Sequence, residues 1–377
     1  MKNQEKYRVM LFDASYEDGS LQGVMDEIFR QFPLDLNGKK VLVKPNILAG
    51  EPPEKGVTTH PAVVKAVVEK LKAEGALVMV GDNPGVFGYG KSVKAADTAQ
   101  ISQAAGDSFV HLGQHPVKTK LPSKDIPHVM ISRDVLEADL VINLPKLKTH
   151  GLTFYTGAIK NTFGYVVGGD KMRVHSQAVT PKRFAQALVD IFSVRPPDLT
   201  IMDAVIAMEG NGPHHGNLRN VGKILASSNA VCLDAVAVTM IGKDPKSVLH
   251  LNIAAEKGLG TLDLDRISLN REITPIPDFK MPVTFVPGIA GMVLNRFLAR
   301  WINCLPQIDQ DKCKQCGLCV KHCPTQAMTM QKKSYPSADK NICINCYCCQ
   351  EMCPEDAIAL KGRTLNFIRR TSKKKPA

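Results

Sequence analysis

The sequence predicts an α/β protein, in which a large domain built on a layered, mostly parallel sheet is followed by a small C-terminal α+β domain. Up to about residue 280, apolar strand-like runs alternate with amphipathic helical stretches. The strand-like runs are continuously apolar, as expected for a parallel sheet that is covered on both faces. Beyond that point the composition changes, because ten of the eleven cysteines lie from Cys304 onward.

The predicted elements alternate in order along the chain. The run VLVKPN at 41–46 is strand-like, and the stretch at 59–76 is an amphipathic helix with Pro61 in its first turn and Gly75 at its end. Further strands are predicted at 76–83, 138–145 and 198–205, a helix at 181–194, and a strand followed by a helix within 222–242.

Four segments divide the 377 residues. We expect the sheet domain at 1–280, a linker helix at 281–304, the small domain at 305–361 and a basic tail at 362–377. The linker helix is inferred from the helical spacing of Ile289, Val293, Phe297 and Trp301. We expect it to pack the small domain against the large one, and the alternative is a helix that lies in a membrane interface.

Charge and hydropathy narrow the class of protein. The N-terminus lacks the features of a signal peptide and no uncharged apolar run is long enough to span a membrane, so we expect a cytoplasmic protein. Of the formal charge of +12, the part from Cys304 to Ala377 supplies 13 Lys or Arg against six Asp or Glu. We interpret the basic end as a solvated tail, with docking to an acidic partner or an anionic membrane surface as alternatives. Nucleic-acid binding is not expected, because no recognition motif accompanies the charge.

Two cysteine runs repeat within the small domain. CKQCGLCVKHCP and CINCYCCQEMCP both follow C-x2-C-x2-C-x3-C-P, which is the run that binds [4Fe–4S] clusters, with the fourth cysteine of each run reaching the other cluster. The sequence therefore predicts two [4Fe–4S] clusters, the first held by Cys313, Cys316, Cys319 and Cys353, and the second by Cys343, Cys346, Cys349 and Cys323. The segment 305–361 resembles a bacterial two-cluster ferredoxin, and the turns after each run are expected to begin short helices.

A pair of zinc sites is the alternative for these cysteines. Zinc sites use two pairs of ligands separated by a longer loop, which does not fit four cysteines within eleven residues. Cys348 would break the spacing and is left out of the ligand sets, while Cys232 lies in an apolar run and is expected to be a core residue.

Polar side chains follow four of the strands predicted for the large domain. In parallel α/β folds ligands bind beyond the carboxyl ends of the strands, so these side chains predict one convergent polar site. They are Lys44 and Asn46, then Asp82 and Asn83, then Asn143, Lys146, Lys148 and His150, and finally Asp203, Glu209, Asn211, His214 and His215. No dinucleotide fingerprint, phosphate loop or nucleophile elbow is present, so no NAD, flavin or ATP site is expected.

The stretches VKPNILAG, TTHPAVVKAVVEKL, GDNPG, NLPKLKTHGLTFYTGAIKNTFG and DAVIAMEGNGP resemble the uncharacterised domain family numbered 362, over roughly residues 8–260. Members often carry a C-terminal ferredoxin-type module, and the resemblance implies an iron–sulfur protein of the kind found in anaerobic bacteria and archaea. It also implies that the following motif residues share one site: Lys44, Asn46, His60, Asp82, Lys146, Lys148, His150, Lys160, Asn161 and Glu209.

Several lysines in one apolar segment predict a site for an anion such as a carboxylate or a phosphate. Stacked positive charge lowers lysine pKa values, so we expect Lys160, His150, Lys146 and Lys148 to act as acid–base groups. Lys44, Asn46, His60, Asp82, Asn161, Glu209 and Asn211 are expected to bind the ligand. The alternative is that the lysines are scattered on a solvated loop.

Together these features predict an iron–sulfur oxidoreductase in which the clusters exchange electrons with an anionic small molecule held in the large domain. Two other functions stay open. The protein is an electron-carrier or docking subunit that serves a redox protein partner, or it is a maturation factor that transfers a cluster or metal.

Overall fold

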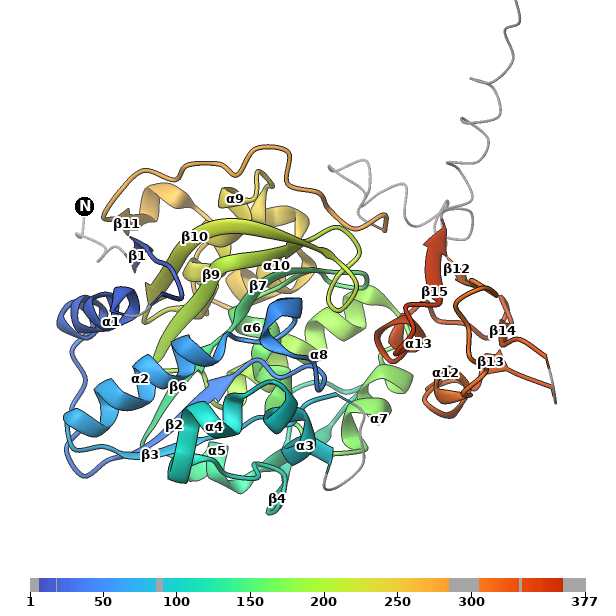
Figure 1. The fold of residues 1–377 in the computed structure, drawn as a ribbon, viewed down its shortest axis with the longest axis horizontal. Coiled ribbons are helices and arrows are strands. Elements are labelled where there is room, and N and C mark those ends of the chain that lie inside the picture. The colour runs from blue at the N-terminus through green and yellow to red at the C-terminus, as the bar shows by residue number, and fades with distance from the viewer. Residues whose placement is uncertain (1–6, 18, 86–90, 285–304, 332–333, 362–377) are drawn as a thin grey trace, which may run out of the picture.

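The computed structural model of the chain describes residues 7–17, 19–85, 91–284, 305–331 and 334–361. A large α/β domain is followed by a C-terminal module, residues 305–361, which lies at one end of the domain (Figure 1). The expected linker helix at 281–304 falls almost wholly outside the described residues, and so does the basic tail at 362–377.

A mixed nine-stranded sheet forms the centre of the large domain, in the order β11-β1-β10-β9-β6-β2-β3, with β7 and β8 attached beside β9. Its strands are β1 (Tyr7–Asp13), β2 (Lys40–Pro45), β3 (Leu77–Val80), β6 (Leu140–Leu144), β7 (Lys146–His150), β8 (Phe154–Thr156), β9 (Leu199–Glu209), β10 (Asn217–Ser227) and β11 (Ile267–Leu269). The pairs β2–β3, β2–β6, β6–β9, β7–β9 and β1–β11 are parallel. The pairs β1–β10, β9–β10 and β7–β8 are antiparallel. The predicted α/β class with a mostly parallel sheet is therefore confirmed.

Helices cover both faces of this sheet. They are α1 (Ser20–Gln31), α2 (Pro61–Ala73), α3 (Lys91–Thr98), α4 (Ile101–Ala105), α5 (Arg133–Glu137), α6 (Ala158–Asn161), α7 (Asp170–Gln177), α8 (Pro181–Val194), α9 (Ala230–Met240) and α10 (Leu249–Glu256). Short 3-10 turns lie at Pro53–Lys55, Gly106–Ser108, Thr162–Tyr165, Pro245–Ser247 and Leu264–Arg266, and a hairpin of β4 (Pro116–Lys120) and β5 (His128–Ser132) stands apart from the main sheet.

Alternate residues of one strand enter different cores, because successive side chains of a strand point to opposite faces. Val41 and Val43 of β2 pack with α1, α2 and α4, whereas Leu42 packs with α7 and α8. In the same way, Ile224 of β10 joins the first core and Leu225 joins a third core around α9 and α10. These two-sided strands explain why their sequences are continuously apolar.

The helix boundaries follow from capping chemistry. His60 precedes α2 and accepts a hydrogen bond from Ala62 N–H at Nδ1, while Pro61 occupies the first helical position. Thr180 caps α8 in the same manner, with Oγ1 accepting from Arg183 N–H at 3.2 Å. Both helices therefore begin where the sequence predicts them.

Two antiparallel strand pairs and two single-turn helices build the C-terminal module. The strands β12 (Leu305–Ile308) and β15 (Ile358–Lys361) pair, as do β13 (Met328–Thr329) and β14 (Ser337–Ala338). The helices α12 (Leu318–Lys321) and α13 (Cys348–Glu351) lie within the cysteine runs. The expectation of helices after each run is wrong, because Gln326 and Asp356 adopt positive φ angles of 57° and 47° and turn the chain there instead.

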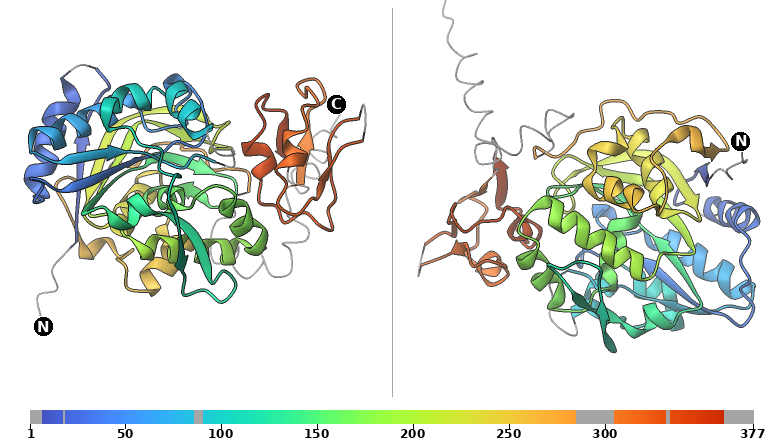
Figure 2. Two further views of the ribbon diagram at one scale, coloured as in Figure 1. Left: turned by 90° about the horizontal axis from the view of Figure 1, so that it is seen from below. Right: turned by 180° about the vertical axis from the view of Figure 1, so that it is seen from behind.

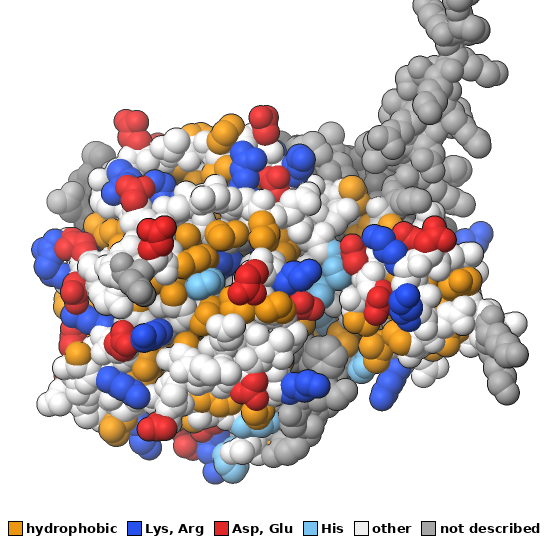
Figure 3. Space-filling view, in the orientation of Figure 1, with side chains coloured by type: hydrophobic (Ala, Val, Ile, Leu, Met, Phe, Trp, Pro, Cys, Tyr) orange, Lys and Arg blue, Asp and Glu red, His pale blue; other side chains and the backbone are white. Residues whose placement is uncertain are grey.

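The module faces the large domain with α13 (Figures 1 and 2), and polar contacts join the two parts there. His150 Nε2 lies 3.2 Å from Glu351 Oε1, and His215 Nδ1 lies 3.5 Å from Asp356 Oδ1. Histidine side chains are visible at this junction in the space-filling view (Figure 3). In the part of the chain that the structure describes, none of the helices has both the length and the apolar character needed to cross a membrane.

Candidate functional site

A pocket lies where the carboxyl ends of several strands meet the C-terminal module. Loops after β2 and β3, the end of β7, and helices α6 and α7 supply its walls from the large domain. Helix α13 supplies the remaining wall through Cys348, Glu351 and the adjoining Met352. The position of the pocket agrees with the rule that ligands bind beyond the carboxyl ends of the strands.

The pocket contains more cations than its carboxylates neutralise. Lys160 and Lys171 line it, and no described residue lies within hydrogen-bond or ion-pair distance of the Lys160 ammonium. Lys171 donates to the carbonyl oxygen of Asn83 and has no carboxylate partner among the described residues. The two carboxylates in the walls already face other groups, since Asp82 pairs with Lys44 at 2.7 Å and Glu351 faces His150.

Burial changes the protonation of these groups. It lowers the pKa of Lys160, an effect that Glu351 opposes, and it lowers the pKa of Lys171 to about 7. Burial also lowers the pKa of His150 to about 4, with Lys160 acting in the same direction. An anion bound beside these lysines would favour their charged forms and is the group that the walls lack.

The hydrogen bonds of His150 fix its tautomer. Nδ1 accepts from the backbone N–H groups of Leu152 at 3.0 Å and Thr153 at 3.4 Å, so the ring proton lies on Nε2. Nε2 then lies 3.2 Å from Glu351 Oε1 across the junction. His150 therefore holds the module against the pocket and is already engaged by a carboxylate.

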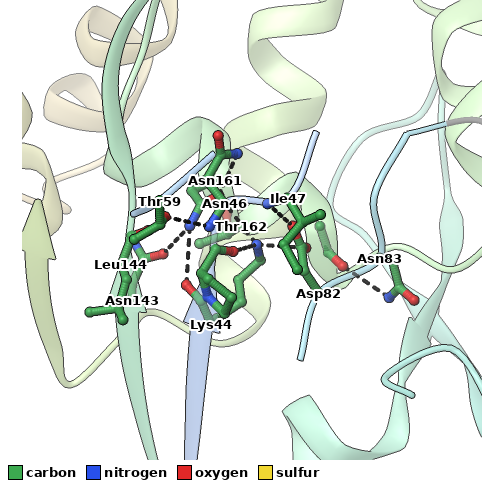
Figure 4. A network of polar contacts seen from close by, with 12 residues as sticks. Lys44, Asn46, Ile47, Thr59, Asp82, Asn83, Asn143, Leu144, Asn161 and Thr162 are labelled. Atoms are coloured by element: carbon green, nitrogen blue, oxygen red, sulfur yellow. Dashed lines mark hydrogen bonds and ion pairs between the residues drawn. The ribbon is translucent and has the colours of Figure 1, made fainter. Parts of the chain in front are cut away.

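A buried polar network forms the floor of the pocket (Figure 4). Lys44 Nζ lies 2.7 Å from Asp82 Oδ1, and the other carboxylate oxygen of Asp82 accepts from Ile47 N–H at 2.7 Å. Gly164 passes so close above this pair that a Cβ there would overlap Asp82 Oδ1 and lie 2.6 Å from Lys44 Nζ. The close approach explains why this position is a glycine.

With Asn83, the structure brings seven of the residues predicted for the site to one place. His150, Lys160, Asn46, Asp82 and Asn161 line the pocket, and Lys44 lies directly beneath them. Lys146 and Lys148 belong to β7 and are buried, but neither lines the pocket. Lys146 pairs with Asp203 at 2.8 Å, and Lys148 donates to the carbonyl oxygen of Val57 at 2.6 Å.

Three further predicted residues lie away from the pocket. His60 stacks on Tyr16 with a centroid distance of 3.6 Å. Glu209 and Asn211 accept backbone hydrogen bonds from Lys280 and Val283, and thus tie down the segment that leaves the large domain. In the structure these residues contribute to the fold.

Several pocket residues were not predicted. Lys171 and His175 lie four residues apart on α7, and Cys348, Glu351 and Met352 come from the module. His175 is buried, and its Nδ1 has no hydrogen-bond partner among the described residues. The i, i+4 spacing of Lys171 and His175 is a signal that the sequence offered, whereas the approach of α13 leaves no mark in a linear sequence.

The eight predicted cluster ligands surround two separate hollows of the module. Cys313, Cys316, Cys319 and Cys353 line one hollow, and Cys323, Cys343, Cys346 and Cys349 line the other. Each set combines three cysteines of one run with the last cysteine of the other, as a pair of [4Fe–4S] clusters requires. Among the described side chains, no three His, Cys, Asp or Glu converge on a point that would hold a single metal ion.

Comparison with protein families identifies both parts of the chain. Residues 41–239 match the family described as "Domain of unknown function (DUF362)", and residues 306–329 match the 4Fe-4S binding domain. The chain is 32% identical over 308 residues to "Thylakoid-associated protein sll1697" of Synechocystis sp., and the match covers 78% of this chain and 95% of that protein.

Two solved structures match part of the chain. A protein from Thermotoga maritima has a TM-score of 0.38 at 14% identity, with 52% of each chain covered. The lactate racemase apoprotein from Thermoanaerobacterium thermosaccharolyticum has a TM-score of 0.40 at 11% identity, with 60% of this chain and 55% of that chain covered. The chain thus spans about half the length of these solved structures.

Proposed function

This chain belongs to the DUF362 family and carries a 4Fe-4S binding domain, and from this premise we propose that it is an oxidoreductase. The 4Fe-4S binding domain supports an iron–sulfur electron-transfer protein. In this proposal, electrons pass between the C-terminal module and an anionic small molecule bound in the pocket. The direction of transfer follows from the ligand, since the same arrangement serves reduction and oxidation alike.

One observation carries the proposal. The pocket has cationic walls from the large domain and a wall from α13, and Cys348 in that wall is the neighbour of Cys349, a predicted cluster ligand. A ligand in the pocket would therefore contact the helix that contains Cys349 of the second cysteine set. A site for binding alone has no need of that helix, whereas electron transfer requires short distances.

The cysteine geometry fits two [4Fe–4S] clusters, with Cys313, Cys316, Cys319 and Cys353 holding one, and Cys343, Cys346, Cys349 and Cys323 holding the other. When bound, such clusters supply or accept electrons one at a time. The protein residues then have three tasks, which are to bind the anion, to move protons and to keep the module docked.

Lys160 is the residue that we assign to anion binding and proton transfer. Its ammonium lines the pocket and has no ion-pair partner in the part of the chain that the structure describes. Burial lowers its pKa, which makes proton release easier than from a surface lysine. Lys171 is suited to the same task, while His150 holds Glu351 and thereby positions α13.

An electron carrier without a substrate of its own is the second candidate. It is favoured by the exposure of Cys316, since the first cysteine set thereby opens to the surface, where a redox protein partner could dock. In that case, the pocket would play no part in the redox reaction. The experiment below separates the two functions.

We propose a cytoplasmic location, in keeping with the lack of a membrane-crossing helix among the described residues. The relative from Synechocystis is named as thylakoid-associated. The alternative to test is therefore contact with a membrane surface through the basic tail at 362–377.

The test begins with the iron-loaded protein under anaerobic conditions, reduced with dithionite and freed of the excess. Cluster absorbance is followed after the addition of pooled small organic anions, and in a separate arm after the addition of a redox protein. Reoxidation by the anions, with strong loss in Lys160→Ala and partial retention in Lys160→Arg, is the expected result. Lys65→Ala is the control, because that lysine lies on the surface of α2 and its side chain is 63% exposed.

Reoxidation by the redox protein alone, at equal rates in the wild type and in Lys160→Ala, would establish the carrier function instead. Each variant, Lys160→Ala, Lys160→Arg and Lys65→Ala, must retain the iron content of the wild type for the rates to be compared. A rate that falls equally with both acceptors would point to damage of the module.

A further inference from the structure

The orientation of three buried amides in the pocket floor specifies a feature of the ligand. We propose that the ligand carries a neutral hydrogen-bond donor, a hydroxyl or N–H group, beside its anionic group, and that Asn46 Oδ1 recognises this donor. The inference rests on the proposed function, because it concerns the ligand of the same pocket.

Lys44 fixes the orientation of Asn161. The Lys44 ammonium can only donate hydrogen bonds, and it lies 3.2 Å from Asn161 Oδ1 (Figure 4). The amide nitrogen of Asn161 therefore points the other way, where it donates to Asn143 Oδ1 at 2.8 Å and to the carbonyl oxygen of Lys44 at 3.3 Å.

Asn143 supports the same orientation from the opposite end. Its amide nitrogen donates to the carbonyl oxygen of Ala158 at 3.1 Å, and a carbonyl oxygen can only accept. Asn143 must therefore present its own oxygen to Asn161. The two ends of the network agree, so none of these amides can be reversed without losing hydrogen bonds.

Asn46 is the last amide of the network. Its nitrogen donates to Asn161 Oδ1 at 3.0 Å, and its backbone N–H donates to Thr59 Oγ1 at 2.8 Å. The side-chain oxygen that remains is buried and has no hydrogen-bond partner among the described residues, and Asn46 lines the pocket. A buried acceptor without a partner costs free energy, so a ligand that donates to it gains affinity.

The other walls define the rest of the ligand. Lys160 and Lys171 call for an anionic group, and Leu48, Phe163 and Met352 provide an apolar surface for a short carbon body. A cationic ammonium group on the ligand would be repelled by the two lysines, which favours a hydroxyl or neutral N–H as the donor. The ligand class is therefore a small hydroxylated acid, either a carboxylate or a phosphate monoester.

Matched pairs of ligands test this directly in the iron-loaded protein by anaerobic titration calorimetry. The pairs are glycolate and acetate, malate and succinate, and glycerol 3-phosphate and propyl phosphate, so that the carboxylate and phosphate arms are separate. We expect the hydroxylated member to bind about tenfold or more tightly in at least one pair. Glycine, which replaces the hydroxyl of glycolate by an ammonium, is expected to bind more weakly than glycolate.

Asn46→Ala should abolish the preference within the pair. Asn83→Ala is the matched control, because Asn83 also lines the pocket but its amide nitrogen donates to the carbonyl oxygen of Gly164, and this variant should keep the preference. Equal affinities within every pair overturn the inference, as does a lack of binding in all pairs or a preference that survives in Asn46→Ala. The wild-type comparison needs no variant to fold.

The outcome is separable from that of the proposed function. Anions that reoxidise the reduced protein without any preference for a hydroxyl would leave the oxidoreductase standing and remove this inference. A preference for the hydroxylated ligand in binding, without reoxidation by any anion, would support this inference and remove the oxidoreductase proposal.

Discussion

His150 at the end of β7 and Glu351 in α13 face each other across the domain junction, with 3.2 Å between Nε2 and Oε1. Both side chains are largely buried, at 1% and 16% exposure. The strand that carries the lysines of the predicted anion site thus also carries the residue that docks the module. The pocket is closed by this contact, and not by the large domain alone.

The first prediction concerns that contact. His150→Ala leaves the Glu351 carboxylate buried without its partner, at a cost of about 1–3 kcal/mol to the docked arrangement. Hydrogen exchange at the amides of Gln350 and Met352, which close the turns of α13, should accelerate accordingly. Arg183→Ala, which removes a solvent-exposed ion pair with Asp125, should leave exchange in α13 as it is in the wild type.

A second prediction follows from the burial of Lys171. Burial lowers its pKa from 10.5 to about 7, so between these pH values the unfolded chain binds more protons than the folded chain at this group. The group therefore destabilises the fold below about pH 7, and the penalty disappears as pH rises towards 10.5. Lys171→Met should raise the melting temperature most at pH 7, and the gain should shrink at pH 8 and pH 9.

The matched control for Lys171 is Lys65→Met on the exposed face of α2, which should give a difference in melting temperature that does not change with pH. A constant gain for Lys171→Met across the same pH range would contradict the prediction.

Two neighbouring glycines provide a third prediction. Gly164→Ala places a methyl group against the buried pair of Lys44 and Asp82, and separation of such a pair costs roughly 3 kcal/mol or more. Gly169→Ala meets nothing within 4 Å and has an ordinary φ of −64°. Denaturant unfolding should therefore show a large loss for Gly164→Ala and almost none for Gly169→Ala; similar losses would contradict this account of Gly164.

The fourth prediction concerns the iron content of two cysteine variants. Cys349→Ser removes a predicted ligand of the second cluster and should lower the iron content from about eight to about four per chain. Cys348→Ser should keep about eight, because Cys348 lines the pocket and not the cysteine hollow. Iron and sulfide analysis of the two proteins, purified without oxygen, makes the comparison. Loss of iron in both would place Cys348 among the ligands.

The sequence was sufficient to predict most of the large domain, because its strands and helices carry strong local signals. The helix at 181–194 matches α8 residue for residue, since Thr180 and Pro181 mark its start. The antiparallel partnership of β10 with β1 and β9 has no comparable signal. The direction of pairing depends on the path by which the chain returns to the sheet. A short apolar run has the same sequence pattern whether its strand pairs in parallel or antiparallel fashion.

The site was predictable only in part for a related reason. Lys44 lies near the end of β2, Asn46 and Asp82 follow β2 and β3, and all three could be found from the rule for strand ends. Lys146 and Lys148 satisfy the same rule, yet β7 continues the sheet and leaves them paired with Asp203 and with the Val57 carbonyl. Lys148 and His150 lie on the same side of β7, because side chains alternate along a strand, and only His150 at its end lines the pocket. How far β7 continues the sheet is set by its pairing with β9, which is distant in sequence.

A pocket that borrows one wall from a second domain makes ligand binding and domain docking a single coupled equilibrium. Glu351 and Met352 can contact a ligand only while the module is docked, so a ligand that binds there must tighten docking by the same factor by which docking tightens binding. Covalent connection of the two domains raises their effective concentration and keeps this equilibrium on the docked side. Binding of the ligand would thus stabilise the docked position of the cysteine-rich module without any larger rearrangement of the fold.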